Sequence, residues 1–180
     1  MRAISKRRRL AFLLGVAAVV ALLGASAAYA LTAKSFRYDS PKIGYVRVHN
    51  MAFAPFNLDD NYTNSWPNGL FSGLGACLNA GVDLPPGSRV KAITFYFKSN
   101  TSSDLFGVLM RRRLSTGGAT ELARATPVND ANTPTSVTVN VPGTKQAVTA
   151  DHAFGVGVCP GTDNFFYGAR IKYTYTSAGS

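Results

Sequence analysis

The sequence predicts an all-β protein that folds as a single antiparallel β-sandwich with a jelly-roll-like or other Greek-key topology. Three observations predict this fold class. Apolar and polar residues alternate with a period of two in most segments. Turn-forming stretches such as "STGG", "PGT" and "CPGTDN" recur between those segments. Glu121 is the single glutamate, whereas Thr, Val, Tyr and Phe are plentiful, and this composition favours strands over helices.

Seven or eight short segments carry the strand pattern, and none shows helical periodicity. In residues 90–97, Ile93, Phe95 and Phe97 share one face, as expected for a strand with one buried side. The segment near the end of the chain that includes Phe154 alternates large side chains with a face of Ala, Gly and Cys only, which would let another layer approach closely. The predicted strands are 45–48, 76–84, 90–97, 104–114, 121–125, 136–142, 153–159 and 165–176.

The last predicted strand places Phe165, Tyr167, Ala169 and Ile171 on one face and Phe166 on the other. Residues 49–75 fit the strand pattern least well, because Asn, Asp, Gly and aromatic residues are mixed there without a period. A long irregular segment in a compact domain is either functional or packed over an open end of the sandwich.

Residues 1–30 are expected to be a signal peptide. A basic start ending at Arg9 precedes an uncharged apolar run, and Ala28-Tyr29-Ala30 forms a small-x-small cleavage site. A retained signal anchor and a twin-arginine signal are the alternatives. Residues 31–42 would be an N-terminal extension and residues 43–180 the sandwich domain. The sequence thus predicts a secreted, extracellular bacterial protein without stable membrane insertion after cleavage.

The charge of the chain changes when this segment is removed. Without the five Lys and Arg residues of 1–30, the net charge of +10 becomes +5. A modest positive charge favours anionic surfaces such as a cell wall or an acidic polysaccharide, or simply keeps the protein soluble. Nucleic acid is not an expected partner, because the sequence has no basic helix and no nucleic-acid-binding motif.

Cys77 and Cys159 are the two cysteines of the chain. In an exported protein a lone pair of cysteines is most simply one disulfide, which here would join two predicted strands far apart in sequence. Metal binding would need more ligands than the two cysteines and two histidines supply, and no cofactor is expected.

A resemblance adds to this interpretation. "CLNAGVDLPPGSRVKAITFYF", "DLFGVLMRR" and "FYGARIKYTYT" resemble a group of uncharacterised secreted bacterial β-sandwich proteins, over residues 76–176. The shared features are the cysteine-containing strand, a V-x-LP-x-G turn and a terminal GARI-x-Y strand. The resemblance implies the fold and export, and it implies no activity.

No enzyme is predicted. The sequence has neither a G-x-S-x-G elbow nor an H-E-x-x-H motif. Asp151 and His152 are adjacent, but neighbouring residues on a strand point to opposite faces and give no triad geometry. Most acidic residues lie in predicted turns, where Asp bonds to the local backbone. A hydrolase of unrecognised type stays the third hypothesis for function.

The irregular segment carries the candidate ligand-binding residues. Tyr62, Trp66 and Phe71 lie there beside Asn57 and Asn64. Aromatic rings flanked by amides are suited to a carbohydrate, which has apolar faces and polar edges. The alternative is that Trp66 and Phe71 cover the sandwich core.

Two charged groups are weaker candidates. Asp59, Asp60 and Asp163 offer oxygen ligands that could hold calcium, although ordinary turns are the favoured explanation for them. Arg111 and Arg113 share one face of a predicted strand and could bind an anion, or Arg111 could pair with an acid at the strand end.

The strand containing Arg111 is apolar on both faces. Phe106, Val108 and Met110 lie opposite Leu105 and Leu109, so one strip is covered by a second layer or by a partner. A homo-oligomer through Phe106, Val108 and Met110 is therefore possible.

The function predicted from the sequence is an exported, non-catalytic binding module for cell-wall or environmental polysaccharide. The alternative is a structural or self-assembling surface protein.

Overall fold

The computed structural model describes residues 36–57, 61–65, 69–72, 76–100, 105–127 and 133–178 of the 180-residue chain. Residues 38–176 form one compact unit. The second unit, residues 1–37 and 177–180, lies almost wholly outside the described residues, and so does the expected signal peptide. The first strand begins at Phe36, ahead of the domain start expected at residue 43.

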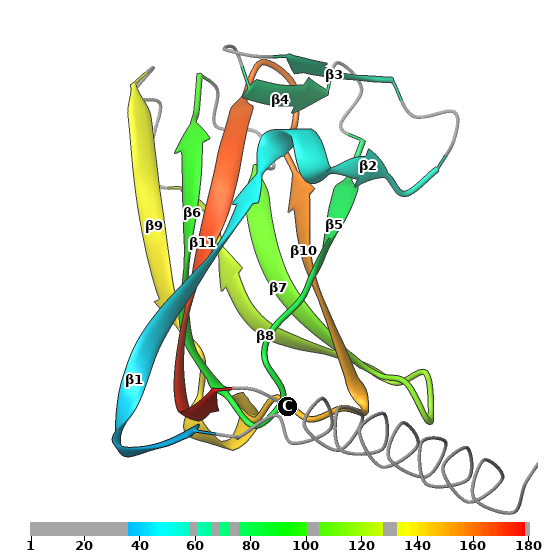
Figure 1. The fold of residues 1–180 in the computed structure, drawn as a ribbon. Coiled ribbons are helices and arrows are strands. Elements are labelled where there is room, and N and C mark those ends of the chain that lie inside the picture. The colour runs from blue at the N-terminus through cyan, green and yellow to red at the C-terminus, as the bar shows by residue number, and fades with distance from the viewer. Residues whose placement is uncertain are drawn as a thin grey trace, which may run out of the picture. The chain divides into compact units, whose positions relative to one another are not determined.

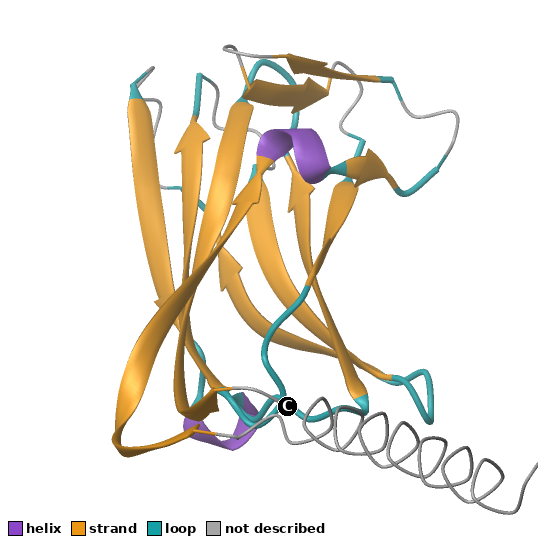
Figure 2. Cartoon of the chain, in the orientation of Figure 1, coloured by secondary structure: helices purple, strands orange, loops and turns teal. Residues whose placement is uncertain are grey.

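The described residues form eleven strands in two sheets (Figures 1 and 2). One sheet has the order β3-β4-β11-β6-β9, with β1 also paired to β11, and the other has the order β2-β5-β10-β7-β8. Every strand pair with a defined register is antiparallel. The bounds are β1 Phe36–His49, β2 Ala54–Pro55, β3 Tyr62–Ser65, β4 Gly69–Ser72, β5 Leu78–Val82, β6 Arg89–Lys98, β7 Phe106–Arg113, β8 Ala119–Ala125, β9 Pro134–Asn140, β10 His152–Cys159 and β11 Phe165–Ala178. Two short 3₁₀ helices, η1 (Asn50–Ala52) and η2 (Gly143–Lys145), connect strands.

The strand pairs of the sandwich are nested. Among β1 and β5 to β11, the first strand pairs with the last, β5 with β10, β6 with β9, and β7 with β8. The pairs β11·β6 and β10·β7 then join these ladders into two sheets. This nesting of antiparallel pairs across two sheets is the jelly roll, so the fold class expected from the sequence is confirmed.

The core lies between the two sheets and draws on both. Phe95 and Phe97 of β6 are fully buried, as are Leu109 of β7 and Val156 of β10. The period-two alternation predicted the inward faces of β6 and β10 correctly, whereas β7 is apolar on both faces and its inward face could not be predicted. Gly107 is required where β7 passes the ring of Phe95, because a Cβ atom at that position would lie 2.5 Å from the ring.

The face assignment predicted for the last strand is wrong in its first half. Phe166 is fully buried together with Ala169 and Ile171, whereas Phe165 and Tyr167 are only partly buried. The cause is a β-bulge, since the register of β11 against β6 shifts between Phe166 and Gly168. One extra residue in the strand reverses which side chains face the core, and alternation alone does not reveal it.

Residues 49–75, the segment with the weakest strand signal, contain η1, β2, β3 and β4. Figure 1 shows the β3–β4 hairpin lying across one end of the long strands. Leu70 of β4 is fully buried and Phe53 stacks edge-to-face on Phe166, with ring centroids 5.0 Å apart. This part of the segment therefore covers an open end of the sandwich.

Candidate functional site: a groove on the five-stranded sheet

The outer face of the five-stranded sheet is hollowed into an open groove of about 530 Å³. Its residues come from β5, β10, β7 and β8 and from Phe56, which follows β2. We call this feature the groove. It is larger than two hollows on the outer side of the other sheet, which have volumes of about 340 and 270 Å³.

The floor of the groove is made by β10. Phe154, Val156 and Val158 point inward and are buried, so the outward positions are the small residues predicted from the sequence. At Gly155 a Cβ atom would meet only the backbone oxygen of Ala80, at 3.4 Å. The groove therefore exists because side chains are missing from its floor, and a side chain at Gly155 would occupy it.

One wall of the groove is the apolar strip of β7. Phe106, Val108 and Met110 line it, while Leu105 and Leu109 are buried on the opposite face. In the register of β7 against β10, Val108 lies beside Gly157 and Met110 beside Gly155. The apolar strip predicted from the sequence thus borders the groove and is not covered by a second layer of strands.

The other wall comes from β8 and depends on a bulge. The register of β7 against β8 shifts between Leu109 and Met110, which leaves Leu122 as the extra residue of β8. Glu121 and Arg124 consequently share the outer face, although three positions separate them. Arg124 Nη2 donates to Glu121 Oε2 over 2.7 Å. The side-chain hydrogen bond to Glu121 raises the pKa of Arg124 above its ordinary value.

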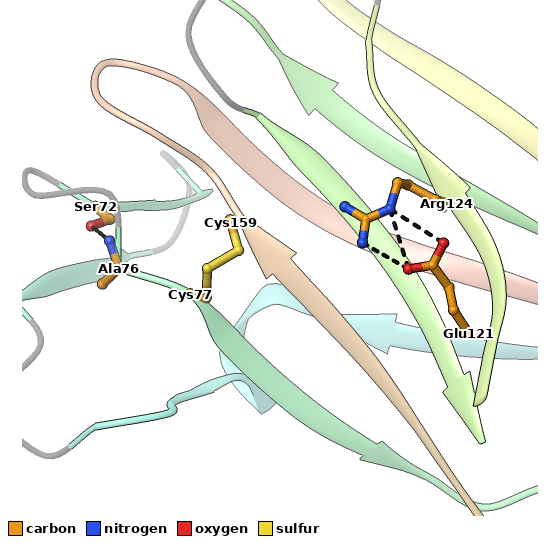
Figure 3. Close-up of a disulfide and its surroundings, with 6 residues drawn as sticks. All are labelled: Ser72, Ala76, Cys77, Glu121, Arg124 and Cys159. Carbon is orange, nitrogen blue, oxygen red and sulfur yellow. Dashed lines mark hydrogen bonds and ion pairs between the residues drawn. A yellow bond between two sulfur atoms is a disulfide. The ribbon is translucent and has the colours of Figure 1, made fainter. Parts of the chain in front are cut away.

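The disulfide closes one end of the groove. Cys77 and Cys159 are bonded, with their Cα atoms 4.2 Å apart, and they continue the ladder beyond the pair Leu78–Val158. Figure 3 shows the bridge joining the start of β5 to the end of β10, with the Glu121–Arg124 pair farther across the sheet. The disulfide predicted from the sequence is confirmed.

Phe56 stands at this same end of the groove. Its backbone N–H donates to the carbonyl of Cys77 over 3.1 Å, so the residue is tied to the disulfide-bonded strand. The residue is 61% exposed, although phenylalanine is among the residues most often buried in globular proteins. Next to it, Asn79 of β5 brings an amide to the groove. This end of the groove therefore combines exposed apolar surface with a hydrogen-bonding amide.

The arginine run divides between the two faces of β7. Arg112 lines the groove and is exposed. Arg111 and Arg113 alternate with Arg112, as predicted, although Arg111 also borders the groove, and each has a partner: Arg111 donates to the carbonyl of Lys145 over 3.3 Å, and Arg113 pairs with Asp151 at 3.5 Å. The acid at this strand end therefore pairs with Arg113 rather than with Arg111, the residue that the alternative interpretation named.

The predicted ligand-binding residues of 49–75 do not all share one face. The β3–β4 register sets Tyr62 opposite Ser72 and Asn64 opposite Leu70, whereas Phe71 lies opposite Thr63 on the other side of the hairpin. Asn64 donates to the carbonyl of Asn50, and Phe71 packs on Phe165 with ring centroids 5.4 Å apart. Asn57 follows Phe56 near the groove, and Trp66 lies outside the described residues.

The calcium and catalytic candidates can be placed only in part. Asp59 and Asp60 lie outside the described residues, and Asp163 is an exposed turn residue with φ of 61°. No group of three or more His, Cys, Asp or Glu side chains in the described part of the chain could hold a metal ion. No helix in that part is long and apolar enough to cross a membrane.

Asp151 and His152 serve different partners. Asp151 accepts hydrogen bonds from the side chain and backbone of Ser115, and these bonds lower its pKa. His152 lies 3.0 Å from the hydroxyl of Thr149, and burial together with Arg111 and Arg113 lowers its pKa. The hydrogen bonds of Asp151 to Ser115 and of His152 to Thr149 thus join neighbouring turns, and they direct the two side chains to different partners.

No protein-family model and no curated protein sequence matches the chain. Among solved structures, it is similar to the C-terminal family 6 carbohydrate-binding module of a marine laminarinase from Zobellia galactanivorans, with 16% identity, a TM-score of 0.46, and coverage of 71% of this chain and 98% of that one. It is also similar to a family 15 xylan-binding module, with 12% identity, a TM-score of 0.42, and coverage of 76% and 97%. A third similar structure is that of infectious bursal disease virus, with 11% identity, a TM-score of 0.36, and coverage of 77% and 33%. The sheet topology of the chain itself, and not these similarities, defines the jelly roll.

Proposed function

We propose that the protein is a binding module that holds a polysaccharide chain in the groove. The observation that carries this proposal is the open hollow on the outer face of the sheet, whose floor has no side chain at Gly155, while a methyl group of Val108 lies over Gly157. An outer sheet face is normally covered by its own side chains. A hollow along one strand of that face, bordered by side chains of β7 and β8, has room for a ligand.

The lining suits the chemistry of sugars. Phe56 and Met110 provide apolar surface against which the C–H face of a sugar ring can pack. Asn79, Arg112 and Glu121 provide donors and acceptors for hydroxyl groups. Mixed surfaces of this kind bind ligands that have both apolar faces and polar edges.

The same lining argues for binding without catalysis. Among the described residues that line the groove, Glu121 is the only carboxylate, and Arg124 already engages it. Hydrolysis of a glycosidic bond ordinarily uses two carboxylates placed on either side of that bond. The groove is therefore proposed to retain a chain rather than to cleave it.

Filling the groove tests the proposal. Gly155→Leu puts a side chain into the hollow, and the nearest atom to its Cβ is a backbone oxygen at 3.4 Å, so the sheet should tolerate it. We expect Gly155→Leu to abolish retardation of the protein in affinity gels that contain a binding polysaccharide, with an unchanged melting temperature. Gly143→Leu is the matched control, because nothing lies within 4 Å of a Cβ there and η2 is not part of the groove. Equal retardation of wild type and Gly155→Leu would refute the proposal.

A structural, self-assembling role is the second candidate function. Phe106, Val108 and Met110 make one wall of the groove strongly apolar, and a second copy of the chain could cover that wall. Sedimentation of the wild type at rising concentration separates the two functions. Assembly that Gly155→Leu disrupts would favour the structural role, and a monomer that binds glycans would favour the binding module.

We also propose that the protein works outside the cytosol. The Cys77–Cys159 disulfide supports this, because such bonds persist in oxidising compartments. The apolar segment of residues 10–30, which ends in small residues, is a second argument for export. Intact-mass analysis of the protein recovered from the medium of a bacterial host tests it, with Leu31 as the expected first residue. Recovery only from the cytosol, with residues 1–30 attached, would contradict it.

A further inference from the structure

The outer face of the six-stranded sheet carries a concentration of positive charge that the groove does not explain. Alternation fixes the direction of its side chains. Val48 is buried, so Arg47 of β1 points outward, and buried Ala169 and Ile171 leave Arg170 and Lys172 of β11 on the outside. On β6, Lys98 follows buried Phe97 and also points outward. We call Arg47, Lys98, Arg170 and Lys172, with Tyr45, Tyr96 and Tyr167, the basic face.

Almost no acid balances these cations. On the described residues of β1, β6, β9 and β11, the only Asp or Glu is Asp39. It lies eight positions before Arg47 in the same strand, a separation of roughly 26 Å in extended chain. No ion pair with a described residue is formed by Arg47, Arg170 or Lys172. Charge that a protein leaves unneutralised over neighbouring strands attracts anions.

Aromatic rings alternate with the cations. The Arg170 guanidinium lies 5.3 Å from the ring centroid of Tyr45, and Lys98 Nζ lies 5.7 Å from that of Phe165. These contacts hold the long side chains against the sheet without neutralising them. The cations are therefore presented at defined positions, which lowers the entropy cost of binding a ligand.

A pocket of about 270 Å³ lies in the middle of this face, lined among others by Arg47, Arg170, Tyr96 and Tyr167. A neighbouring hollow of about 340 Å³ shares the two tyrosines and extends to Ser136 of β9. Gly168, beside the β11 bulge, lines the pocket. It has a φ of 142°, and a Cβ atom there would lie 2.6 Å from the carbonyl oxygen of Val48, so glycine lets β1 approach β11 closely and bring Arg47 to the pocket.

The lining of this pocket is matched to an oxyanion. Two guanidinium groups provide planar arrays of N–H donors, the geometry that binds carboxylate, sulfate or phosphate oxygens. Two phenol groups add O–H donors to the same space. Burial raises the pKa of Tyr167 above its ordinary value of 10.0, so the group is a hydrogen-bond donor and not an anion in this pocket.

We propose that the basic face is a second binding site, which takes an anionic polysaccharide and seats one of its acidic groups between Arg47 and Arg170. The disulfide favours a polysaccharide over a nucleic acid, because it indicates a compartment outside the cytosol, where the anionic polymers are mainly glycans. The groove and the basic face lie on the outer sides of two different sheets. One molecule could thus hold two polymers at once, and this second site does not depend on the function proposed for the groove.

Binding of defined polymers to the purified protein tests this proposal. The probes are polygalacturonate and heparin as anionic glycans, xylan as a neutral glycan, duplex DNA, and phosphatidylserine vesicles. We expect at least one anionic glycan to bind with an affinity that falls steeply with salt, and to bind more tightly than DNA or vesicles. Arg47→Gln and Arg170→Gln should each weaken that binding roughly ten-fold, as the loss of a charge-assisted contact predicts.

Two control variants distinguish binding at the basic face from a general effect of net charge and from binding in the groove. Arg113→Gln makes the same change in net charge on the other sheet, away from the basic face, and should leave the affinity for the anionic glycan within about two-fold. Loss of the exposed Arg113–Asp151 ion pair should cost little stability. Gly155→Leu should also leave the affinity for the anionic glycan unchanged. The proposal for the groove can therefore be refuted while the proposal for the basic face is supported, and the reverse. Tighter binding to DNA or vesicles, no binding to either anionic glycan, or full binding by the double Arg47→Gln, Arg170→Gln variant would each overturn the proposal.

Discussion

The guanidinium of Arg124 lies over the ring of Phe106, with its Cζ atom 4.4 Å from the ring centroid. The two residues belong to neighbouring strands, β8 and β7, and the same guanidinium bonds to Glu121. One side chain therefore covers an aromatic wall of the groove and also orients its carboxylate. Because Leu122 bulges, this arrangement uses residues that simple alternation would place on opposite faces.

Arg124→Ala should change the affinity for a groove ligand while changing the stability of the fold only slightly. The side chains of Arg124 and Glu121 are 47% and 41% exposed, so the loss of the cation–π contact and the ion pair should cost less than about 1 kcal/mol of unfolding free energy. The same change uncovers Phe106 and frees Glu121, so affinity for a groove ligand should change measurably. Glu121→Gln, which leaves Arg124 over the ring, is the matched control. Thermal melting and a glycan titration measure both effects, and a large loss of stability would show that the contact is structural.

Removing the disulfide should destabilise the fold. Its cysteines are separated by 82 positions, and loss of a native disulfide typically costs about 2–5 kcal/mol. We expect Cys77→Ser combined with Cys159→Ser to lower the urea midpoint by a corresponding amount. A reductant should shift the wild type to the same midpoint and leave the double variant unchanged. Equal midpoints for oxidised and reduced wild type would contradict the prediction.

Gly107→Ala should disturb the core. Its Cβ atom would lie 2.5 Å from Cδ1 of the fully buried Phe95, and overpacking of this kind typically costs about 1–3 kcal/mol. Gly81→Ala is the control, because nothing lies within 4 Å of a Cβ at that position. Phe95→Leu should partly relieve the clash, so the cost in the double variant should be less than the sum of the two single costs. Additive costs in urea unfolding would show that the two residues do not interact.

Asp151 should make the stability of the protein depend on acid pH. Hydrogen bonds from Ser115 hold the pKa of this carboxyl below its ordinary value of 3.8 in the folded state. The carboxyl therefore contributes its stabilisation above about pH 4, and that stabilisation is lost as the pH falls through the lowered folded pKa. Asp151→Asn should flatten this dependence when urea unfolding is compared at pH 5 and pH 3. An identical pH profile for the variant would contradict the assignment.

Much of the scaffold is predictable from local sequence. Alternation in β6 and β10 identifies Phe95, Phe97, Phe154 and Val156 as core, because burial of one sheet face imposes a period of two. The parity of the cysteines predicts their bond. The bulges of β11 and β8 are not predictable in this way, since one extra residue changes the face of every side chain beyond it without altering the composition.

The groove could be predicted only in pieces. The small outward face of β10 and the apolar strip of Phe106, Val108 and Met110 are both visible in the sequence. That they lie side by side depends on the pairing of β10 with β7, which are separated by some forty residues, and strand order is not encoded locally. Phe56, Asn79 and Arg124 have no motif, and only the fold brings them to one place.

The nesting of the strand pairs predicts an order for folding. The β7–β8 hairpin needs the shortest loop, whereas β1 and β11 meet only after most of the chain lies between them, and each wider pair closes a longer loop. Assembly from the inner hairpin outward is therefore the least costly route. Cys77 and Cys159 reach each other when β5 joins β10, one step before the outermost strands. Oxidation of the two thiols during folding is therefore expected to report that the β5–β10 pair has formed while the outermost pair, β1–β11, has not.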